Sequence, residues 1–193
     1  MCVFCGSSTG NDSLYLEAAR QFGGLLGRRG LRLVYGGGRV GLMGAVADGA
    51  LDAGAEVVGV ITRALQGREI AHPGLDELLV VETMHERKAA MADRADAFVM
   101  LPGGFGTWDE FMEVVTWAQL GIHVKPCAVL EVGDFFAGFR QLVADATGAG
   151  FIRPRYQQLV LMDHDPGSLI DRLAAWSPVD AADDAVVLGR AQR

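Results

Sequence analysis

Residues 98–120 read Phe-Val-Met-Leu-Pro-Gly-Gly-Phe-Gly-Thr-Trp-Asp-Glu-Phe-Met-Glu-Val-Val-Thr-Trp-Ala-Gln-Leu. In this stretch an apolar run ends in a glycine-rich turn, and a segment with helical period follows. The run predicts a buried strand over 98–101, and the segment predicts a helix over 107–120. A strand that enters a helix through so short a turn is typical of a βαβ unit, so the stretch favours a parallel sheet.

The same alternation of short apolar runs and longer helical segments continues along the chain. It predicts strands over 2–5, 31–35, 57–61, 78–81, 98–101, 127–131 and 159–161. It predicts helices over 13–29, 42–53, 85–95, 107–120, 135–149 and 166–176. We therefore expect an α/β fold: a doubly wound, mostly parallel, Rossmann-like sheet with helices on both faces. Residues 1–178 are expected to form a single domain, and the Ala/Asp-rich residues 179–193 a loosely ordered tail.

The composition argues against several classes of protein. Seventeen basic against 24 acidic side chains give a net charge of −7, which leaves little basic surface for nucleic acid. No apolar run approaches the roughly 20 residues of a membrane span. The first residues, Met-Cys-Val-Phe-Cys-Gly, lack the basic start of a signal peptide. We expect a soluble cytoplasmic protein that binds neither nucleic acid nor membrane.

The cysteines and histidines predict neither a disulfide nor a metal site. Three cysteines are too few for a disulfide framework. Cys2 and Cys5 form a C-x-x-C, but strand residues three apart point to opposite faces and lie roughly 10 Å apart, beyond disulfide reach. The four histidines show no metal-ligand spacing. We therefore expect no metal and no cofactor.

A first glycine pattern, G-x-G-x-x-G, occupies Gly36, Gly38 and Gly41 after a predicted strand. A dinucleotide site would also need an acidic residue at the far end of the next strand, and that strand leads into Arg63 instead. Arg63 could meet a ribose phosphate, so an NADP-dependent oxidoreductase stays open. The alternative is that these glycines only let the helix and the strand pack closely.

The glycines of the second pattern, Gly103, Gly104 and Gly106, precede the helix predicted to open at Thr107. Their backbone N–H groups can point inward and add to the helix dipole, which makes a site for an anion such as a phosphate. The loop is not a Walker A motif, because no Gly-Lys-Ser/Thr follows. The structural alternative is a tight turn in which Thr107 caps its helix.

Charged residues flank this loop. Glu110 follows Thr107 by three residues, so we expect it in the first helical turn, facing whatever the loop holds. The helix dipole and a nearby cation would keep its carboxylate ionised, which suits a base or a group that stabilises positive charge. It could also be a capping-box glutamate. Arg87 and Lys88, adjacent cations after the strand over 78–81, form either a solvated helix face or a site where Arg87 meets a phosphate or a leaving group.

Three segments together resemble the Lonely Guy (LOG) family: Tyr-Gly-Gly-Gly at 35–38 with Gly-Leu-Met-Gly at 41–44, Met-His-Glu-Arg-Lys at 84–88, and Pro-Gly-Gly-Phe-Gly-Thr-Trp-Asp-Glu at 102–110. The similarity covers most of the chain except the tail. LOG proteins are cytokinin nucleoside monophosphate phosphoribohydrolases, many of which were once labelled lysine decarboxylases. The resemblance implies hydrolysis of the N-glycosidic bond of an adenosine monophosphate, often prenylated, to free base and ribose monophosphate.

The resemblance also implies roles for individual residues. Arg87 and Glu110 fall on the family's catalytic pair, and Ser7 and Lys88 fall on nucleotide-contacting positions. The phosphate-binding loop corresponds to Gly103, Gly104, Gly106 and Thr107. A homodimer is implied as well, and the many apolar side chains on the helix over 107–120 favour one independently.

Two further classes stay open beside the hydrolase. A nucleotide-binding module without turnover would keep the glycines but would not need Glu110. Decarboxylation through pyridoxal phosphate would require Lys88 or Lys125, the two lysines of the chain, as the Schiff-base residue. The sequence does not distinguish a prenyl pocket from one that fits plain AMP.

Overall fold

The structure is a computed structural model that describes residues 1–66 and 70–178. Within these residues, seven strands form one sheet in the order β4-β3-β2-β1-β5-β6-β7, and each pair of neighbours is parallel. The strands are β1 (Cys2–Phe4), β2 (Leu33–Tyr35), β3 (Val57–Thr62), β4 (Glu77–Val81), β5 (Phe98–Met100), β6 (Cys127–Leu130) and β7 (Val160–Asp163). The α/β, doubly wound, parallel prediction is confirmed.

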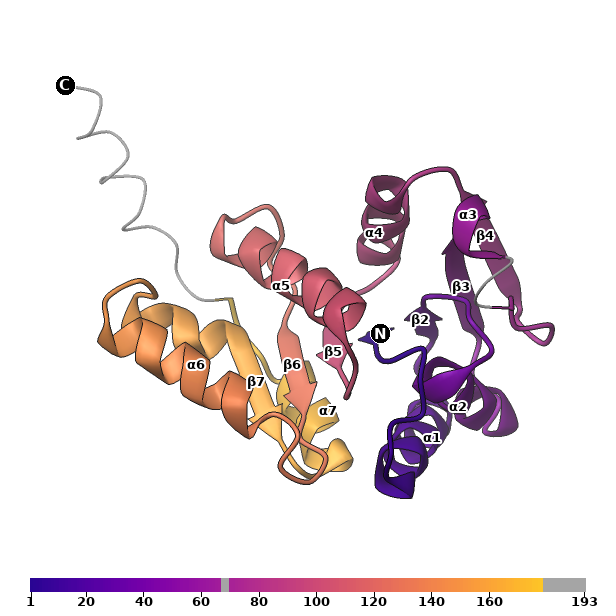
Figure 1. Ribbon diagram of the computed structural model, residues 1–193, viewed down its shortest axis with the longest axis horizontal. Helices are drawn as coiled ribbons and strands as arrows, with labels where there is room; N and C mark the ends of the chain where they lie inside the picture. The colour runs from indigo at the N-terminus through magenta and orange to yellow at the C-terminus, as the bar shows by residue number, and fades with distance from the viewer. Residues whose placement is uncertain (67–69, 179–193) are drawn as a thin grey trace.

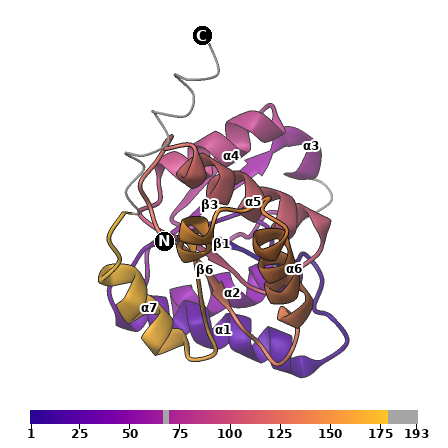
Figure 2. The same cartoon turned by 90° about the vertical axis from the view of Figure 1, so that its left-hand side faces the viewer.

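Helices cover both faces of the sheet (Figures 1 and 2). One apolar core lies between the sheet and α1, α2 and α7, and the other lies between the sheet and α4 and α5, with aromatic side chains from the start of α6. The helices are α1 (Ser13–Arg28), α2 (Gly41–Asp52), α3 (Arg63–Gln66), α4 (Met84–Asp93), α5 (Phe105–Gln119), α6 (Ala137–Gly148) and α7 (Pro166–Ala174), with a 3₁₀ helix η1 (Pro154–Leu159). None of the described helices is long and apolar enough to cross a bilayer.

The strands alternate between the two cores as the pleat requires. Val3 and Cys5 belong to the core under α1, whereas Cys2 and Phe4 belong to the core under α4 and α5. The prediction that Cys2 and Cys5 point to opposite faces is therefore confirmed, and both thiols are free and buried.

The strand order decides where a ligand can bind. From central β1 the chain builds outward through β2, β3 and β4, then returns to the other side of β1 and builds outward through β5, β6 and β7. The loops that leave β1 and β5 therefore run in opposite directions and open a crevice at the carboxyl edge of the sheet. The glycine loop before α5 lies at this switch point, and the loop with the G-x-G-x-x-G pattern lies one strand away.

The structure corrects one boundary that matters for the site. The predicted start at Thr107 of the helix over 107–120 is wrong, because this helix, α5, begins at Phe105 with Gly104 as its N-cap. Gly106 has a low helix propensity, so the sequence did not indicate that the helix begins before it. The two short elements, α3 and η1, were not predicted. The predicted tail, 179–193, lies outside the described residues.

Candidate active site

Backbone hydrogen bonds join three loops at the crevice. The N–H of Gly6, after β1, donates to the carbonyl of Pro102, after β5, over 3.0 Å. The N–H groups of Leu42 and Met43, in the first turn of α2, donate to the carbonyl of Gly6 over 3.0 and 3.2 Å. The loop after β1 is thus held from both sides, so the crevice has fixed walls.

These bonds also assign the G-x-G-x-x-G loop a packing role. Gly41 has a φ of +67°, and a Cβ there would lie 2.3 Å from the carbonyl carbon of Ser7, so only glycine fits. The first N–H groups of α2 bind the Gly6 carbonyl, where a dinucleotide enzyme would bind pyrophosphate. Arg63, the candidate for a ribose phosphate, pairs with Glu82 over 2.8 Å. The geometry therefore favours close packing over an NADP site.

The N-terminus of α5 is open to a ligand. The first helical hydrogen bond runs from the N–H of Trp108 to the carbonyl of Gly104 over 3.1 Å, so the N–H groups of Phe105, Gly106 and Thr107 precede the helical ladder. A Cβ on Gly104 or Gly106 would meet no atom within 4 Å. These two glycines leave a path along which an anion can approach the helix dipole.

Gly103 and Thr107 pack against each other in the same loop. A Cβ on Gly103 would lie 2.2 Å from Oγ1 of Thr107 and 2.9 Å from the backbone nitrogen of Gly6. Thr107 is buried, and its side chain folds back over Gly103 instead of capping the helix. Gly103 is therefore needed for the contact between loops.

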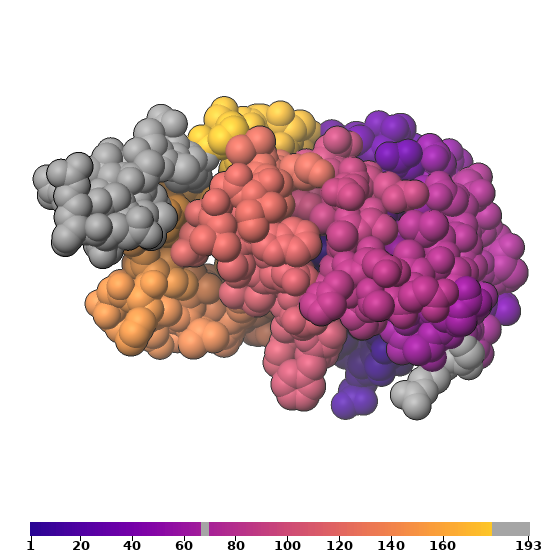
Figure 3. Space-filling model, turned by 90° about the horizontal axis from the view of Figure 1, so that it is seen from above, coloured from indigo at the N-terminus to yellow at the C-terminus, as the bar shows by residue number. Residues whose placement is uncertain are grey.

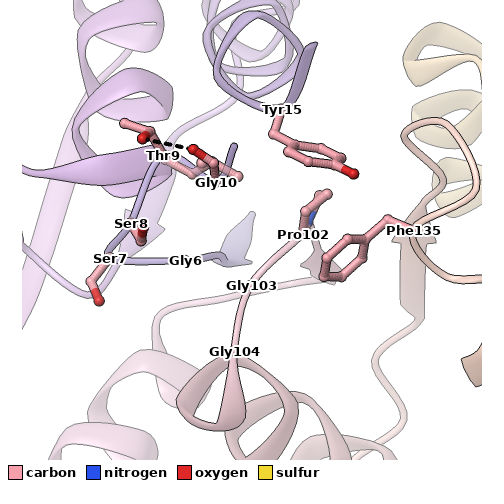
Figure 4. Close-up of a pocket in the computed structure, with 11 residues that line it drawn as sticks. Gly6, Ser7, Ser8, Thr9, Gly10, Tyr15, Pro102, Gly103, Gly104 and Phe135 are labelled. Carbon is pink, nitrogen blue, oxygen red and sulfur yellow. Dashed lines mark hydrogen bonds between the residues drawn. The ribbon is translucent and has the colours of Figure 1, made fainter. Parts of the chain in front are cut away.

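A cavity of about 290 Å³ adjoins the loop, near the lower end of the roughly 300–1,000 Å³ common for ligand pockets. Its lining combines residues from the loops after β1 and β5 with two aromatic rings, Tyr15 of α1 and Phe135 before α6 (Figure 4). The ring centroids lie 5.6 Å apart in an edge-to-face arrangement. Ser7 extends away from this aromatic pair (Figure 4). Tyr15 and Phe135 were not predicted as site residues from the sequence, although both follow strands whose carboxyl ends meet at this edge.

A capping box at the start of α4 orients Arg87, and this local signal was not predicted from the sequence. Thr83 and Glu86 form a capping box, in which the Glu86 N–H donates to Thr83 Oγ1 over 3.1 Å. This start places Arg87 on the inward side of the helix, with only 6% of its side chain exposed. Its Nε donates to the carbonyl of Val60 over 2.9 Å, and its Nη2 donates to the carbonyl of Gly36 over 3.2 Å.

Glu110 lies beside this guanidinium. Its Oε1 is 3.4 Å from Nη1 of Arg87, and 11% of its side chain is exposed. The predicted first-turn position is wrong, because Glu110 is in the second turn of α5, on the same side as the buried Thr107 and Phe111. Burial first, and the charge of Glu110 second, raise the pKa of the Cys5 thiol, in line with a carboxylate close to β1. The structure thus brings Arg87 and Glu110 together near the open N-terminus of α5.

Lys88, next to Arg87, is directed at α5. Its Nζ lies 2.7 Å from Oδ2 of Asp109 and 3.1 Å from Oε2 of Glu113. Burial lowers the pKa of Lys88, but its contacts with the two carboxylates together outweigh this effect, so the net shift of the pKa is upward. The side chain therefore stays a charged ammonium at neutral pH. Among the described residues, no cluster of three or more His, Cys, Asp or Glu side chains is placed to hold a metal.

Comparisons with known proteins add a chemical context. The sequence matches the protein family described as "Possible lysine decarboxylase" over residues 43–173. It is 44% identical over 178 residues to a probable cytokinin riboside 5'-monophosphate phosphoribohydrolase of Oryza sativa subsp. japonica, covering 92% of this chain and 73% of that protein. A cytokinin riboside 5'-monophosphate phosphoribohydrolase of Arabidopsis thaliana is 42% identical, with 92% and 84% covered.

Solved structures share the fold at lower identity. The molybdenum cofactor binding protein from Rippkaea orientalis superposes with a TM-score of 0.70 at 19% identity, covering 90% of this chain and 94% of that one. The Moco carrier protein from Chlamydomonas reinhardtii gives a TM-score of 0.66 at 21% identity, with 90% and 96% covered. This likeness concerns the arrangement of strands and helices only.

Proposed function

The chain belongs to the LOG family of cytokinin riboside 5'-monophosphate phosphoribohydrolases, and from this premise we propose that it hydrolyses the N-glycosidic bond of an adenosine monophosphate, plain or prenylated, to free base and ribose 5'-monophosphate. One observation carries the assignment of the site. A largely buried carboxylate, Glu110, with 11% of its side chain exposed, lies less than two helical turns from the open N-terminus of α5.

The phosphate is assigned to the N-terminus of α5. The N–H groups at the start of the helix, reached past Gly104 and Gly106, supply donors and the positive end of the dipole. Thr107 and Gly103 keep this turn in shape, and Ser7 is exposed on the neighbouring loop. The phosphate itself does not react. The binding energy of the phosphate is therefore available to position the sugar.

Glu110 is assigned the chemistry at the sugar. Cleavage of a bond from ribose to purine develops oxocarbenium character at the anomeric carbon and negative charge on the leaving base. A carboxylate offsets the first and can orient the attacking water. Because Glu110 is largely buried, its charge acts at lower dielectric than in water and is correspondingly stronger.

Arg87 fits a role toward Glu110 better than a role toward the phosphate. Two of its nitrogens already donate to the carbonyls of Val60 and Gly36, and a third lies against the Glu110 carboxylate. These contacts fix the guanidinium in one orientation and compensate its buried charge. We infer that Arg87 holds Glu110 in place and in its ionised form.

Lysine decarboxylation through pyridoxal phosphate is the less favoured activity. A Schiff-base lysine needs an uncharged amine that can reach the cofactor. Lys88 is a charged ammonium between two carboxylates, and Lys125 donates to the carbonyl of Ala92 over 2.8 Å. Both lysines of the chain are therefore engaged in structural contacts.

We further propose that the enzyme is a homodimer through α5 and α6. Phe105 is 86% exposed, and Trp108 and Met112 on the same helix are also exposed. A largely apolar cavity of about 670 Å³ lies between α5 and α6, and the exposed Leu142 lines it. Helix α5 runs along the surface on this side of the molecule (Figure 3). Apolar surface of this kind is covered by a partner in stable assemblies, and a second copy is the simplest one.

The reaction is tested by incubating the purified chain with AMP and with N6-isopentenyl-AMP and following the base by chromatography. We expect base release from at least one of the two, with ribose 5'-monophosphate as the second product. The ratio of the two rates decides between a prenylated and a plain substrate. Binding of both nucleotides without base release would instead identify a nucleotide-binding module. A cytoplasmic location stays a prediction from the sequence.

A further inference from the structure

The charged side chains of α5, near the candidate active site, are all acidic. Asp109, Glu110 and Glu113 lie within five consecutive residues, and α5 has no basic residue. Asp109 and Glu113 are four residues apart on one helix face, where like charges repel each other. Arg87 and Lys88, which form ion pairs with these carboxylates, both come from α4.

Lys88 occupies the position between the two outer carboxylates. Its ammonium group is 2.7 Å from Asp109 and 3.1 Å from Glu113, and only 13% of its side chain is exposed. Asp109, in contrast, is 62% exposed, so this carboxylate could have turned to water instead. One ammonium therefore ties two successive turns of α5 to α4.

The two helices rest on different parts of the sheet. Helix α4 packs on β3 and β4, and α5 packs on β1 and β5. Their relative position decides whether Arg87 reaches Glu110, because each helix carries one of the two side chains. The apolar core between them includes Met91 and Phe111, and such contacts tolerate small shifts better than a hydrogen-bonded ion pair does.

We propose that Lys88 is a positioning residue for the proposed reaction. Its ammonium group bridges Asp109 and Glu113 and so keeps α5 where Glu110 contacts Arg87. The same ammonium balances the excess negative charge beside Glu110. This inference rests on the proposed function. It assigns Lys88 a role through the helix pair, in place of the nucleotide contact that the family resemblance implies.

The proposal predicts a particular pH effect. Arg87 from α4 and the Cys2 and Cys5 thiols from β1 are among the described groups that interact with Glu110. Asp109 and Glu113 are its acidic neighbours along α5. Burial, with the charge of Glu110 as a smaller cause, raises the pKa of both thiols, so they stay neutral near neutral pH. Loss of the Lys88 charge leaves two uncompensated carboxylates beside Glu110, which then binds a proton at higher pH.

The test compares Lys88→Met with Lys88→Arg and with the charge-balanced double variant Lys88→Met/Asp109→Asn. For Lys88→Met we expect kcat to fall about tenfold to a hundredfold, KM for AMP to change less than about threefold, and the acid limb of the pH–rate profile to move to higher pH. Lys88→Arg should restore most of kcat. The double variant should return the acid limb toward its wild-type position.

Two additions keep the test decisive. Lys125→Met removes the other lysine, which binds a carbonyl at the far end of α4, and should leave the acid limb in place. If Lys88→Met does not fold, as judged by its melting curve, Asp109→Asn alone serves, because that exposed side chain is safe to change. Removal of one negative charge should then move the acid limb to lower pH.

A carbon-13 NMR titration of the Glu110 carboxyl carbon, in wild type and variants, measures the pH at which Glu110 binds a proton. This measurement does not depend on turnover. If the wild type releases no base, the proposed function fails, and this titration still decides the role of Lys88. A raised KM with kcat and titration unchanged would make Lys88 a substrate contact and overturn the proposal. Wild-type kinetics and titration in Lys88→Met would overturn it as well.

Discussion

Replacement of Glu110 by glutamine removes one negative charge and little else from the candidate active site. The amide keeps the length of the side chain and can still accept one hydrogen bond. If the carboxylate stabilises developing positive charge, base release from AMP should fall by at least about a hundredfold, or about 2.7 kcal/mol of transition-state stabilisation. Binding of AMP should survive, because the N-terminus of α5 is unchanged.

The same variant should also lose stability, by an amount that the structure bounds. Loss of one partner of a fully buried ion pair costs about 3–5 kcal/mol. The Arg87 guanidinium keeps its bonds to the carbonyls of Val60 and Gly36, and 11% of the Glu110 side chain is exposed, so we expect about 1–3 kcal/mol. For a domain of this size, that lowers Tm by roughly 3–10 °C.

Three measurements separate these effects: base release at 25 °C, AMP affinity by calorimetry, and the thermal melting curve. Glu56→Gln is the matched control, because Glu56 forms an exposed pair with Arg32 over 3.5 Å at the amino end of β3, the opposite edge of the sheet. The control should keep its rate within about twofold and its stability within about 0.5 kcal/mol. Near-normal base release by Glu110→Gln would refute the catalytic assignment at this position.

Further substitutions and substrates test the remaining assignments. Arg87→Ala should lower kcat as strongly as Glu110→Gln does, while it weakens AMP binding only modestly. A rise in the Kd for AMP of more than about tenfold in calorimetry would place the guanidinium on the phosphate instead. Adenosine should be a far poorer substrate than AMP. Gly104→Val should fold, because a Cβ at this position meets open space, but it should bind AMP weakly in the same calorimetric assay. Replacement of both Cys2 and Cys5 by alanine should leave turnover within a few-fold, and slow reaction of the wild-type thiols with a thiol reagent should reflect the pKa values that burial raises. Trp108→Asp should convert a dimer into a monomer in light scattering, and a wild type that is monomeric at micromolar concentration would contradict the dimer.

Much of the fold could be predicted because parallel strands are buried on both faces. Such strands appear as short apolar runs, and all seven were located to within a few residues. The elements that were missed, α3 and η1, span four and six residues, too short for a hydrophobic period to show. The start of α5 was misplaced because Gly106, a residue of low helix propensity, lies in the first turn of the helix.

The site could be predicted only in part. Glycine patterns and adjacent charges indicated the loop before α5, Arg87 and Glu110, because these signals are local in sequence. Two partners of Arg87 are backbone carbonyls, on β3 and after β2, and no side-chain pattern in the sequence indicates them. Tyr15 and Phe135 meet over a long sequence separation, so their contact depends on the strand order.

A crystal structure of Glu110→Gln with bound AMP would show where the phosphate and the ribose lie in the site. We expect phosphate oxygens within about 2.7–3.2 Å of the backbone nitrogens at the start of α5, and the anomeric carbon of the ribose facing the side chain of residue 110. A phosphate bound away from α5, or an anomeric carbon turned away from residue 110, would contradict the proposed roles of α5 and Glu110.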